Sequence, residues 1–319
     1  MLHVTNGSVV VTRLHDLGLP GRVLPWDDVL HEGPVRAGLD RAGLRRERAA
    51  FLAGPATSAA EIERSLADRD QVLDSAAPDA EVVLWFEHDL YDQLHLLQIL
   101  DQLDHPRVTA VLSDDYLSAQ SSATLREWFA ARRPVSDDDR GVARQAWAAF
   151  RSADPMTLAA FVVAAPVGVS RHLLPALRRH LQQFPWRGHG LSRSQAQALA
   201  AVARGAGRVR DAFWAANFPV EDAVFMGDSS WWDHVRPLIE APRPLLAVHG
   251  QKPSTWADPA WWHDDPAAPT LALTADGEAV LTGRADHIAL NGIDRWLGGV
   301  HVTPQTLWRW DEARQTLAV

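Results

Sequence analysis

Three charged residues that could carry acid–base or metal chemistry follow an apolar run directly. Glu87, His88 and Asp89 come after the run at 82–86, and a leucine-rich amphipathic segment follows at 90–103. Short β-branched and aromatic runs are typical of buried strands, whereas apolar residues spaced by three and four are typical of helices. Ligands of open α/β sheets bind where such a strand ends and the next helix begins. We therefore expect these three residues to be catalytic.

The same junction also has a purely structural explanation. Asp89 is a good N-cap for the helix, and an acidic Asp92 in the first turn favours the helix dipole. His95, Gln98 and Gln102 fall on one side of the helix, which we expect to face solvent. Capping requires neither Glu87 nor His88, so a functional role is favoured for these two.

A second polar concentration lies in the loop at 25–34, which is bounded by prolines and contains a tryptophan. We expect His31 and Glu32 to join the catalytic group, and Trp26 and Asp28 to contact a substrate. The alternative is a surface turn in which an aspartate caps a short helical turn. A solvated loop rarely needs a tryptophan and two prolines, so function is slightly favoured.

Two further strand ends contribute polar residues. Asn6-Gly7-Ser8 follows the strand predicted at 2–5, with Ser8 as the expected N-cap of the next helix and the turn as a weak anion site. Asp114 and Asp115 follow the strand predicted at 108–112. The expected catalytic residues are Glu87, His88, His31, Glu32 and Asp89, and the expected substrate-binding residues are Asn6, Gly7, Ser8, Trp26, Asp28, Asp92, Gln93, Asp114 and Asp115.

The elements that must position these residues alternate between strand and helix. Strands are expected at 2–5, 21–24, 82–86 and 108–112, with helices between them, including two polar helices at 41–53 and 58–75. This order predicts an α/β fold with a doubly wound, mostly parallel sheet in residues 1–119. Residues 120–188 read as an all-helical segment, in which the basic stretch with Arg171 and His172 is expected to face solvent.

The last part of the chain, 189–319, combines helices with short strands. Helices are expected at 192–199, 209–216 and 229–239, and strands at 271–274, 278–281 and 296–302, separated by the turns 276–277 and 298–299. Helices followed by a glycine-turned β element resemble a winged helix, so we predict a winged-helix-like α+β domain. Its tryptophans are expected to pack in the core and at interfaces.

Composition limits the classes of protein that fit. The chain has no cysteine, which excludes disulfides and thiolate chemistry, and no apolar run approaches the length of a membrane span. No signal peptide is visible at the start of the chain, so a cytoplasmic location is expected. A single lysine against 30 arginines is typical of a GC-rich bacterial genome.

The net charge of −9 is unevenly distributed. Residues 1–119 carry −10, residues 120–185 carry +4 and residues 186–319 carry −3. None of these parts has the strongly basic character of a non-specific nucleic-acid-binding protein. Nucleic acid is therefore not an expected partner, and a small-molecule ligand is.

Three motifs also carry a resemblance. The segments 3–7, 26–34 and 85–94 resemble, in this order, a bacterial family catalogued as domain of unknown function 1835, over about the first 120 residues. Members often have Asn-Gly-Asp-Ser at the first turn, where this chain has Asn6-Gly7-Ser8. The family name implies no activity, so the resemblance supports the fold and little more.

These observations favour a small-molecule enzyme that performs hydrolysis or group transfer. So many carboxylates in one cleft would raise one another's pKa unless a divalent cation neutralised them, so a bound metal is one option. Mixed His and carboxylate ligands suit Zn²⁺, Mn²⁺ or Fe²⁺, whereas carboxylates alone suit Mg²⁺. No sequence motif identifies a cofactor. The alternatives are a ligand-sensing regulator whose winged-helix module contacts DNA or protein, and a structural protein whose acidic turns are only caps.

Overall fold

The computed structural model describes residues 1–168, 170–252, 258, 261–262 and 268–319. It divides the chain into two compact units, one formed by Met1–His180 with Trp296–His301 and the other by Leu181–Arg295 with Val302–Val319. The three-part division expected from the sequence stays a prediction. None of the helices in the described part combines the length and the apolar composition that crossing a bilayer requires.

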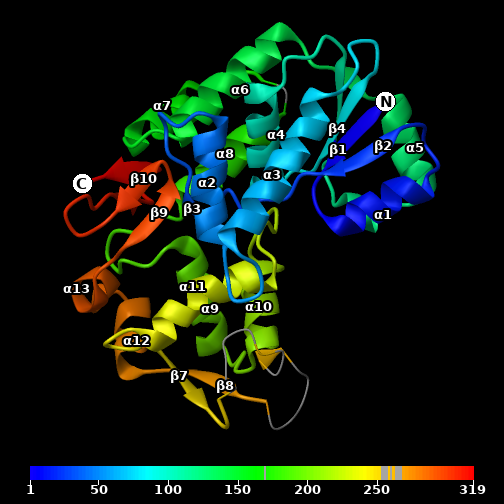
Figure 1. Cartoon of the computed structure of the whole chain (residues 1–319). Coiled ribbons are helices and arrows are strands. Elements are labelled where there is room, and N and C mark those ends of the chain that lie inside the picture. Colours follow the sequence, from blue (N-terminus) through cyan, green and yellow to red (C-terminus); the bar gives the residue numbers. More distant parts are fainter. Residues whose placement is uncertain (169, 253–257, 259–260, 263–267) are drawn as a thin grey trace. The chain divides into compact units, whose positions relative to one another are not determined.

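A five-stranded, mostly parallel sheet forms the centre of the first unit (Figure 1). Its strand order is β2 (Arg22–Pro25), β1 (Leu2–Thr5), β4 (Val82–Phe86), β5 (Val108–Leu112) and β6 (Arg133–Pro134). The first four strands are parallel, and only β6 runs antiparallel to its neighbour. The predicted α/β class and mostly parallel sheet are therefore confirmed. The segment after residue 119 is not wholly helical, because β6 lies in it.

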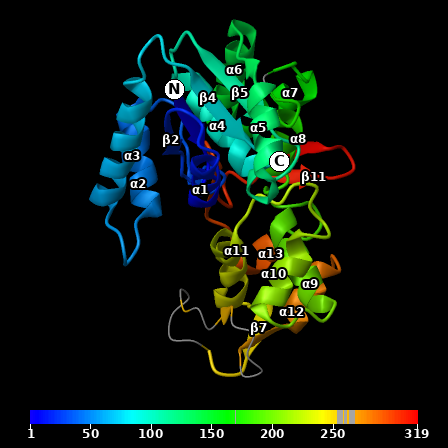
Figure 2. The same cartoon turned by 90° about the vertical axis from the view of Figure 1, so that its right-hand side faces the viewer.

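Helices pack on both faces of this sheet. On one face, α1 (Ser8–Asp16) and α5 (Ser122–Ala130) share a buried cluster with alternate residues of β4, including Val83 and Trp85. On the other face, α4 (Leu90–Gln102) follows β4, and the ring of His95 lies against that of Phe86. The remaining helices of the unit are α2 (Arg41–Leu52), α3 (Ala59–Asp74), η1 (Leu117–Ala119), α6 (Asp137–Phe150), α7 (Pro155–Ala164) and α8 (Leu173–Leu181), and α2 and α3 lie side by side in Figure 2.

The exposed face expected for α4 is wrong. His95 and Gln98 are buried, and Gln102 is only partly exposed. The imidazole Nε2 of His95 lies 2.6 Å from the carbonyl oxygen of Asp28, and Gln98 Oε1 accepts a hydrogen bond of 2.8 Å from Trp26 Nε1. The loop after β2 covers this side of α4, so its polar residues satisfy buried partners instead of water.

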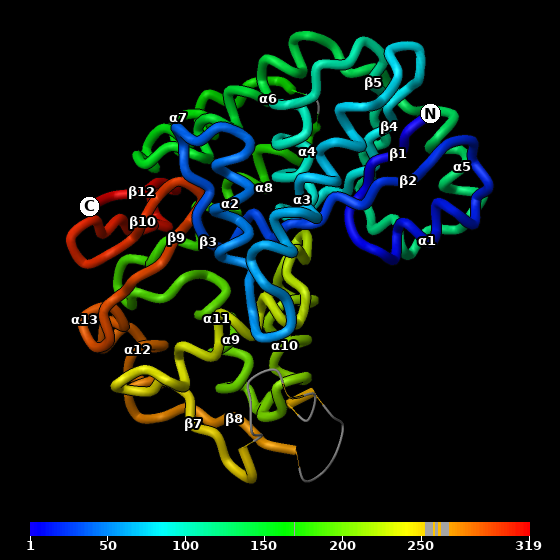
Figure 3. Tube along the Cα trace, viewed as in Figure 1, coloured from blue at the N-terminus to red at the C-terminus, as the bar shows by residue number. Residues whose placement is uncertain are grey.

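A small second sheet joins distant parts of the chain within the first unit. The two-residue strand β3 (Gly33–Pro34) pairs in parallel with β9 (Arg295–Gly298), and β10 (Val300–Val302) completes the order β10-β9-β3 (Figure 3). Gly298 adopts a positive φ of 59°, and a Cβ at this position would lie 2.5 Å from the carbonyl oxygen of Phe150. Glycine is therefore required where the chain turns between β9 and β10.

The second unit combines helices with short antiparallel strand pairs. Its helices are α9 (Arg193–Ala203), α10 (Val209–Asn217), α11 (Asp228–Glu240), α12 (Ala275–Leu281) and α13 (His287–Asn291). β7 (Leu246–His249) pairs with β8 (Thr270–Leu273), and β11 (Arg309–Asp311) pairs with β12 (Thr316–Ala318). The strand expected at 278–281 and the turn before it are wrong, because Thr274 caps a helix there through the amide of Gly277.

Candidate functional site

The predicted site residues follow the carboxyl ends of the parallel strands. β1 and β4 are neighbours, and the chain leaves β1 toward β2 on one side and β4 toward β5 on the other. This reversal creates a topological switch point, the place where open α/β sheets form a crevice. Asn6 and Gly7 follow β1, and Glu87, His88 and Asp89 follow β4.

Three carboxylates converge at this switch point. One oxygen from each of Glu87, Asp89 and Asp92 lies within 4.8 Å of the others. The exposed fractions of the three residues are only 5%, 4% and 0%. We call these three residues the carboxylate cluster. Its members come from one strand end and the first turn of α4, so the junction of strand and helix places them close together.

Backbone and amide donors hold the carboxylate cluster in place. Asp89 caps α4 by accepting a hydrogen bond of 3.0 Å from the amide of Asp92, which confirms the capping role. Asp92 accepts from the amide of Glu87 at 2.5 Å and from Asn6 Nδ2. Glu87 Oε1 accepts from the amide of Leu117 at 2.7 Å, and no described residue donates to its Oε2. That second oxygen is the one available for chemistry.

Burial raises the pKa of every member of the cluster, and acidic neighbours raise those of Glu87 and Asp92 further. The pKa of Glu87 is raised to about 7, first by burial and then by the charge of Asp89. Burial raises the pKa of Asp89 to about 7, against the opposing effect of its amide hydrogen bonds. The pKa of Asp92 is raised by burial and then by its two acidic neighbours. Among the described residues, no arginine, lysine or histidine forms an ion pair with the cluster.

The turn after β1 contacts the cluster from the neighbouring strand. Asn6 donates to Asp92, while the amide of Gly7 donates to Asp27 Oδ1 at 2.9 Å. The N-cap of α1 is Gly7, with a φ of 59°, and no side chain caps this helix end. The capping role expected for Ser8 is therefore wrong, because Ser8 is the first helical residue and lies exposed.

A second group lies beside the cluster and is closer to solvent. The ring of His88 lies 5.1 Å from that of Tyr116 and 5.9 Å from that of His172. The pKa of His88 is lowered by burial and then by the charge of His172, which favours the neutral imidazole. Asp114 Oδ1 lies 2.7 Å from His172 Nε2, and Arg171 holds the pKa of Asp114 below its usual range.

Asp115 closes the turn after β5. Its Oδ2 accepts from Gln120 Nε2 at 2.9 Å, and its amide donates to Ser113 Oγ at 3.0 Å. It is exposed, and its negative charge contributes to the raised pKa of Glu87. Asp115 therefore acts on the cluster through its charge and not by direct contact.

A third group holds the loop after β2. Arg48 Nε and Nη2 donate to the carboxylate of Asp28 at 2.7–3.1 Å, and both side chains are 1% exposed. Arg48 also donates to the carbonyl oxygens of Val29, Glu32 and Pro34. This buried ion pair shapes the loop, so the carboxylate of Asp28 is occupied by Arg48.

The same group contains the other two residues expected to be catalytic. His31 is buried, its Nε2 lies 4.0 Å from Glu32 Oε1, and its ring lies 5.8 Å from that of Tyr91. Tyr91 directly precedes Asp92, and burial, followed by nearby aspartate charges, raises its pKa. The 25–34 loop and the carboxylate cluster thus lie on either side of the start of α4.

Trp26 and Gln93, which were expected to bind substrate, are fully enclosed, as is Asp92. Trp26 has no exposed surface, its indole donates to Gln98, and Arg69 lies 3.7 Å from its ring centroid. Gln93 Nε2 donates to the carbonyl oxygen of Glu87 at 2.6 Å. In the structure Gln93 therefore holds the backbone of Glu87 in place, and Trp26 anchors the 25–34 loop.

Sequence reasoning missed the residues that reach these groups from far along the chain. Arg48 contacts Asp28 across 20 positions, and His172 contacts Asp114 across 58. Arg171 is exposed, as expected, yet it also pairs with Asp114. For Arg171 and His172, the signal in the sequence was the run of basic residues in the helical segment, which does not specify a partner.

Comparison with known proteins adds no assignment. No family model matches the chain, and no curated protein matches it. The resemblance to the family of domain of unknown function 1835 therefore stays a prediction.

Proposed function

We propose that the carboxyl edge of the five-stranded sheet performs hydrolysis or group transfer on a small molecule. The observation that carries this proposal is the carboxylate cluster, in which three buried acids meet without a described cationic partner. Folding alone does not favour such an arrangement, because burying uncompensated like charges costs free energy. Crowded carboxylates at a sheet switch point are instead typical of sites that exchange protons or bind cations.

The cluster has the composition of an acid–base pair. Glu87 and Asp89 interact closely, so their protons leave in two steps that belong to the pair. With one proton between them near neutral pH, one carboxyl can donate to a leaving group while the other accepts from an attacking water. Asn6 and the amide of Glu87 fix Asp92, which keeps the pair in position. We assign the acid and base to this pair ahead of His31 and Glu32, which lie beside Tyr91.

A divalent cation is the second way to balance the same charges. Glu87, Asp89 and Asp92 would hold it, and a set of oxygen donors without histidine suits Mg²⁺ or Mn²⁺. When bound, such a cation polarises a substrate oxygen and lowers the pKa of a bound water. His88, partly exposed and neutral, would exchange protons between the cluster and solvent.

The proposal is tested with a panel of small ester, amide and phosphoester substrates, assayed with and without MnCl₂. Glu87→Gln and Asp89→Asn should each lower the rate by a factor of about 10²–10⁴, because each removes a group that transfers a proton. Glu127→Gln, which replaces an exposed carboxylate on α5, is the control. Wild-type rates in both cluster variants would remove these residues from the reaction.

A ligand-sensing regulator is the second candidate, and the topology of the second unit supports it. Residues 193–273 run in the order α9, α10, α11, β7, β8, and β7 and β8 form an antiparallel pair. Arg208, between α9 and α10, forms a β-bridge to Thr270 in β8. This order and pairing resemble those of a winged helix, in which α11 would take the place of the recognition helix.

The charges on α11 favour a protein partner for such a module over DNA. Asp228, Asp233 and Glu240 are exposed on this helix, where Arg236 is the one basic side chain apart from His234. Phosphate contacts require basic residues on the surface that enters the groove. Fluorescence polarisation with a 30-base-pair duplex at 50 and 200 mM salt should show no salt-dependent binding. Strong binding at the lower salt would favour the DNA-binding regulator.

Three further expectations remain proposals of the same kind. The first 120 residues would belong to the family of domain of unknown function 1835, and the protein would be bacterial and cytoplasmic. The arrangement of motifs 3–7, 26–34 and 85–94 around one end of the sheet supports a shared role for them, since each contributes a residue to the groups described above.

A further inference from the structure

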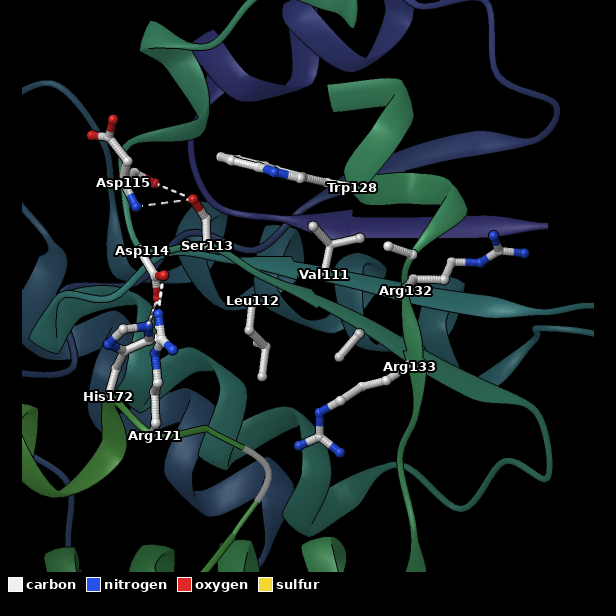
Figure 4. A pocket seen from close by; sticks show the side chains of 12 residues that line it. Val111, Leu112, Ser113, Asp114, Asp115, Trp128, Arg132, Arg133, Arg171 and His172 are labelled. Atoms are coloured by element: carbon white, nitrogen blue, oxygen red, sulfur yellow. Dashed lines mark hydrogen bonds and ion pairs between the residues drawn. The ribbon is translucent and has the colours of Figure 1, made fainter. Parts of the chain in front are cut away.

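A hollow of about 530 Å³ lies along the outer edge of β5 in the first unit (Figure 4). Six consecutive residues, Ala110–Asp115, line one wall. Trp128 of α5, Arg133 of β6 and the pair Arg171 and His172 complete it. This volume falls within the range of small-molecule sites, which is roughly 300–1,000 Å³. We call it the β5 hollow.

The backbone of β5 is unpaired on the side that faces the β5 hollow. β6 pairs only with Thr109 and Ala110, and it ends there. The amide of Ser113 donates to the carbonyl oxygen of Phe86 in β4, so the N–H and C=O of Leu112 point to the opposite side. No described residue bonds to either group. The floor of the hollow thus offers one hydrogen-bond donor and one acceptor.

The side chains around this floor differ between the two faces of the sheet. Val111 and Trp128 lie on one face, and Leu112 lies on the other, between Arg133 and Arg171 (Figure 4). Trp128 packs against the buried cluster that includes Val111, which fixes its ring. An apolar wall with a rigid aromatic ring beside a few polar groups is the usual composition of a ligand pocket.

Arginines outnumber aspartates in the lining of the β5 hollow. Arg132, Arg133 and Arg171 line it against two aspartates. Each arginine also has an acidic partner, which is Glu81 for Arg132, Asp139 for Arg133 and Asp114 for Arg171, so an incoming anion competes with these carboxylates. Arg133 and Arg171 have side-chain exposures of 44% and 73%, so a ligand in the hollow can reach both. These arginines belong to the one segment of the chain, 120–185, whose net charge is positive. In a protein with a net charge of −9, this wall is suited to an anion.

The β5 hollow adjoins the group that contains His88, Tyr116 and His172. His172 lines the hollow and contacts His88, which stands between Glu87 and Asp89 in the sequence. Asp114 and Asp115 belong both to the wall and to the strand ends that form the candidate site. A molecule bound against Leu112 therefore has one end beside the group with His88 and Tyr116.

We propose that the β5 hollow binds a small anionic molecule with an aromatic body, which is the substrate of the site described above. The anionic group contacts Arg133 and Arg171, the ring packs on Trp128, and a polar group pairs with the backbone of Leu112. That the ligand is a substrate rests on the proposed function. That the hollow binds a ligand rests on its geometry alone.

Isothermal titration calorimetry with matched probes tests the binding. 1-Naphthyl phosphate and 1-naphthoate present two kinds of anion on one ring, 1-naphthol lacks the charge, and inorganic phosphate lacks the ring. At least one naphthyl anion should bind at one site per chain, about tenfold or more tighter than both 1-naphthol and inorganic phosphate. The stronger of the two naphthyl anions identifies the anionic group. Equal binding of charged and uncharged probes would overturn the proposal.

Variants locate the site and separate it from the catalytic proposal. Arg133→Gln and Arg171→Gln should each weaken binding of the naphthyl anion about tenfold, whereas Arg126→Gln, an exposed arginine on the same helix as Trp128, should leave it unchanged. Unchanged affinity in both hollow variants overturns this inference even if Glu87 proves catalytic, and loss of turnover in Glu87→Gln is measured independently.

Discussion

Two groups of buried carboxylates lie beside the same helix, α4, and they are balanced in different ways. Asp28 is enclosed by the guanidinium of Arg48, whose remaining N–H groups bind three carbonyl oxygens of the 25–34 loop. The carboxylate cluster has amide donors but no described cation. The first group therefore stabilises the fold. In the second, buried acids remain without a described cationic partner where strands β1 and β4 end.

This difference separates residues that shape the site from residues that could perform chemistry. A satisfied buried ion pair has no capacity left for a ligand, whereas a cluster with raised pKa values responds to protons, cations and polar substrates. Four predictions test the contrast, beginning with the largest expected effect.

Breaking the Arg48–Asp28 pair should produce the largest loss of stability. Arg48→Met leaves the carboxylate of Asp28 buried and unpaired, so the free energy of unfolding should fall by about 3–5 kcal/mol. Urea denaturation followed by circular dichroism measures this change. The control is Arg46→Met on the same helix, where the side chain is exposed and the change should stay within about 0.5 kcal/mol. A similar result for the two variants would refute the structural role of Arg48.

A divalent cation should neutralise the carboxylate cluster as Arg48 neutralises Asp28. At pH 8, MnCl₂ at about 100 times its dissociation constant should stabilise the folded protein by about 2.7 kcal/mol, seen as a higher melting temperature. Asp92→Asn should abolish this increase, since it removes one of the three oxygen ligands. A melting temperature that MnCl₂ leaves unchanged in the wild type would show that protons alone balance the cluster.

Neutralising one member of the cluster should stabilise the protein, but only at high pH. The folded pKa of Glu87, about 7, lies above its ordinary value of 4.5, so its ionisation cost is absent below about pH 4.5 and complete above about pH 7. Glu87→Gln should therefore raise the free energy of unfolding at pH 8 by about 1–3 kcal/mol and leave it nearly unchanged at pH 4.5. Glu127→Gln, on the exposed face of α5, should show no such dependence on pH. An equal effect of Glu87→Gln at both pH values would contradict the raised pKa.

The exposed ion pair between Asp114 and Arg171 should contribute least to the free energy of unfolding. Asp114→Asn removes the partner of Arg171 and His172, but Arg171 and Asp114 are largely exposed, so the free energy of unfolding should change by less than about 0.5 kcal/mol. Thermal denaturation at 50 and 500 mM salt measures this change. A loss of several kcal/mol would place Asp114 with Arg48 and Asp28 in the structural group.

The contrast also explains what the sequence could and could not predict. The strands at 82–86 and 108–112 were predicted to the residue, because each is an apolar run bounded by polar residues. Asp89 was identified as a cap because its contact with Asp92 is local. The ion pair of Arg48 with Asp28 and the contact of His172 with Asp114 were missed, since nothing in one dimension indicates such distant partners.

These wrong predictions have separate physical causes. His95 and Gln98 of α4 read as part of a solvent-exposed face, yet they are hydrogen-bonded to a covering loop. The segment at 278–281 read as a strand because four residues cannot distinguish the period of a strand from that of a helix, and it lies in α12. Tertiary burial decided the first case, and the local cap formed by Thr274 decided the second.

The central claim is that Glu87 and Asp89 share a proton near neutral pH. Carbon-13 NMR of side-chain carboxyl groups between pH 4 and 9 tests it most directly, with Glu87→Gln and Asp89→Asn assigning the two signals by their disappearance. The account predicts that both signals titrate with midpoints near 7 in metal-free protein and that each variant shifts the midpoint of the remaining partner. Midpoints below about 5 for both residues would show that the cluster is fully ionised at neutral pH and would contradict the account.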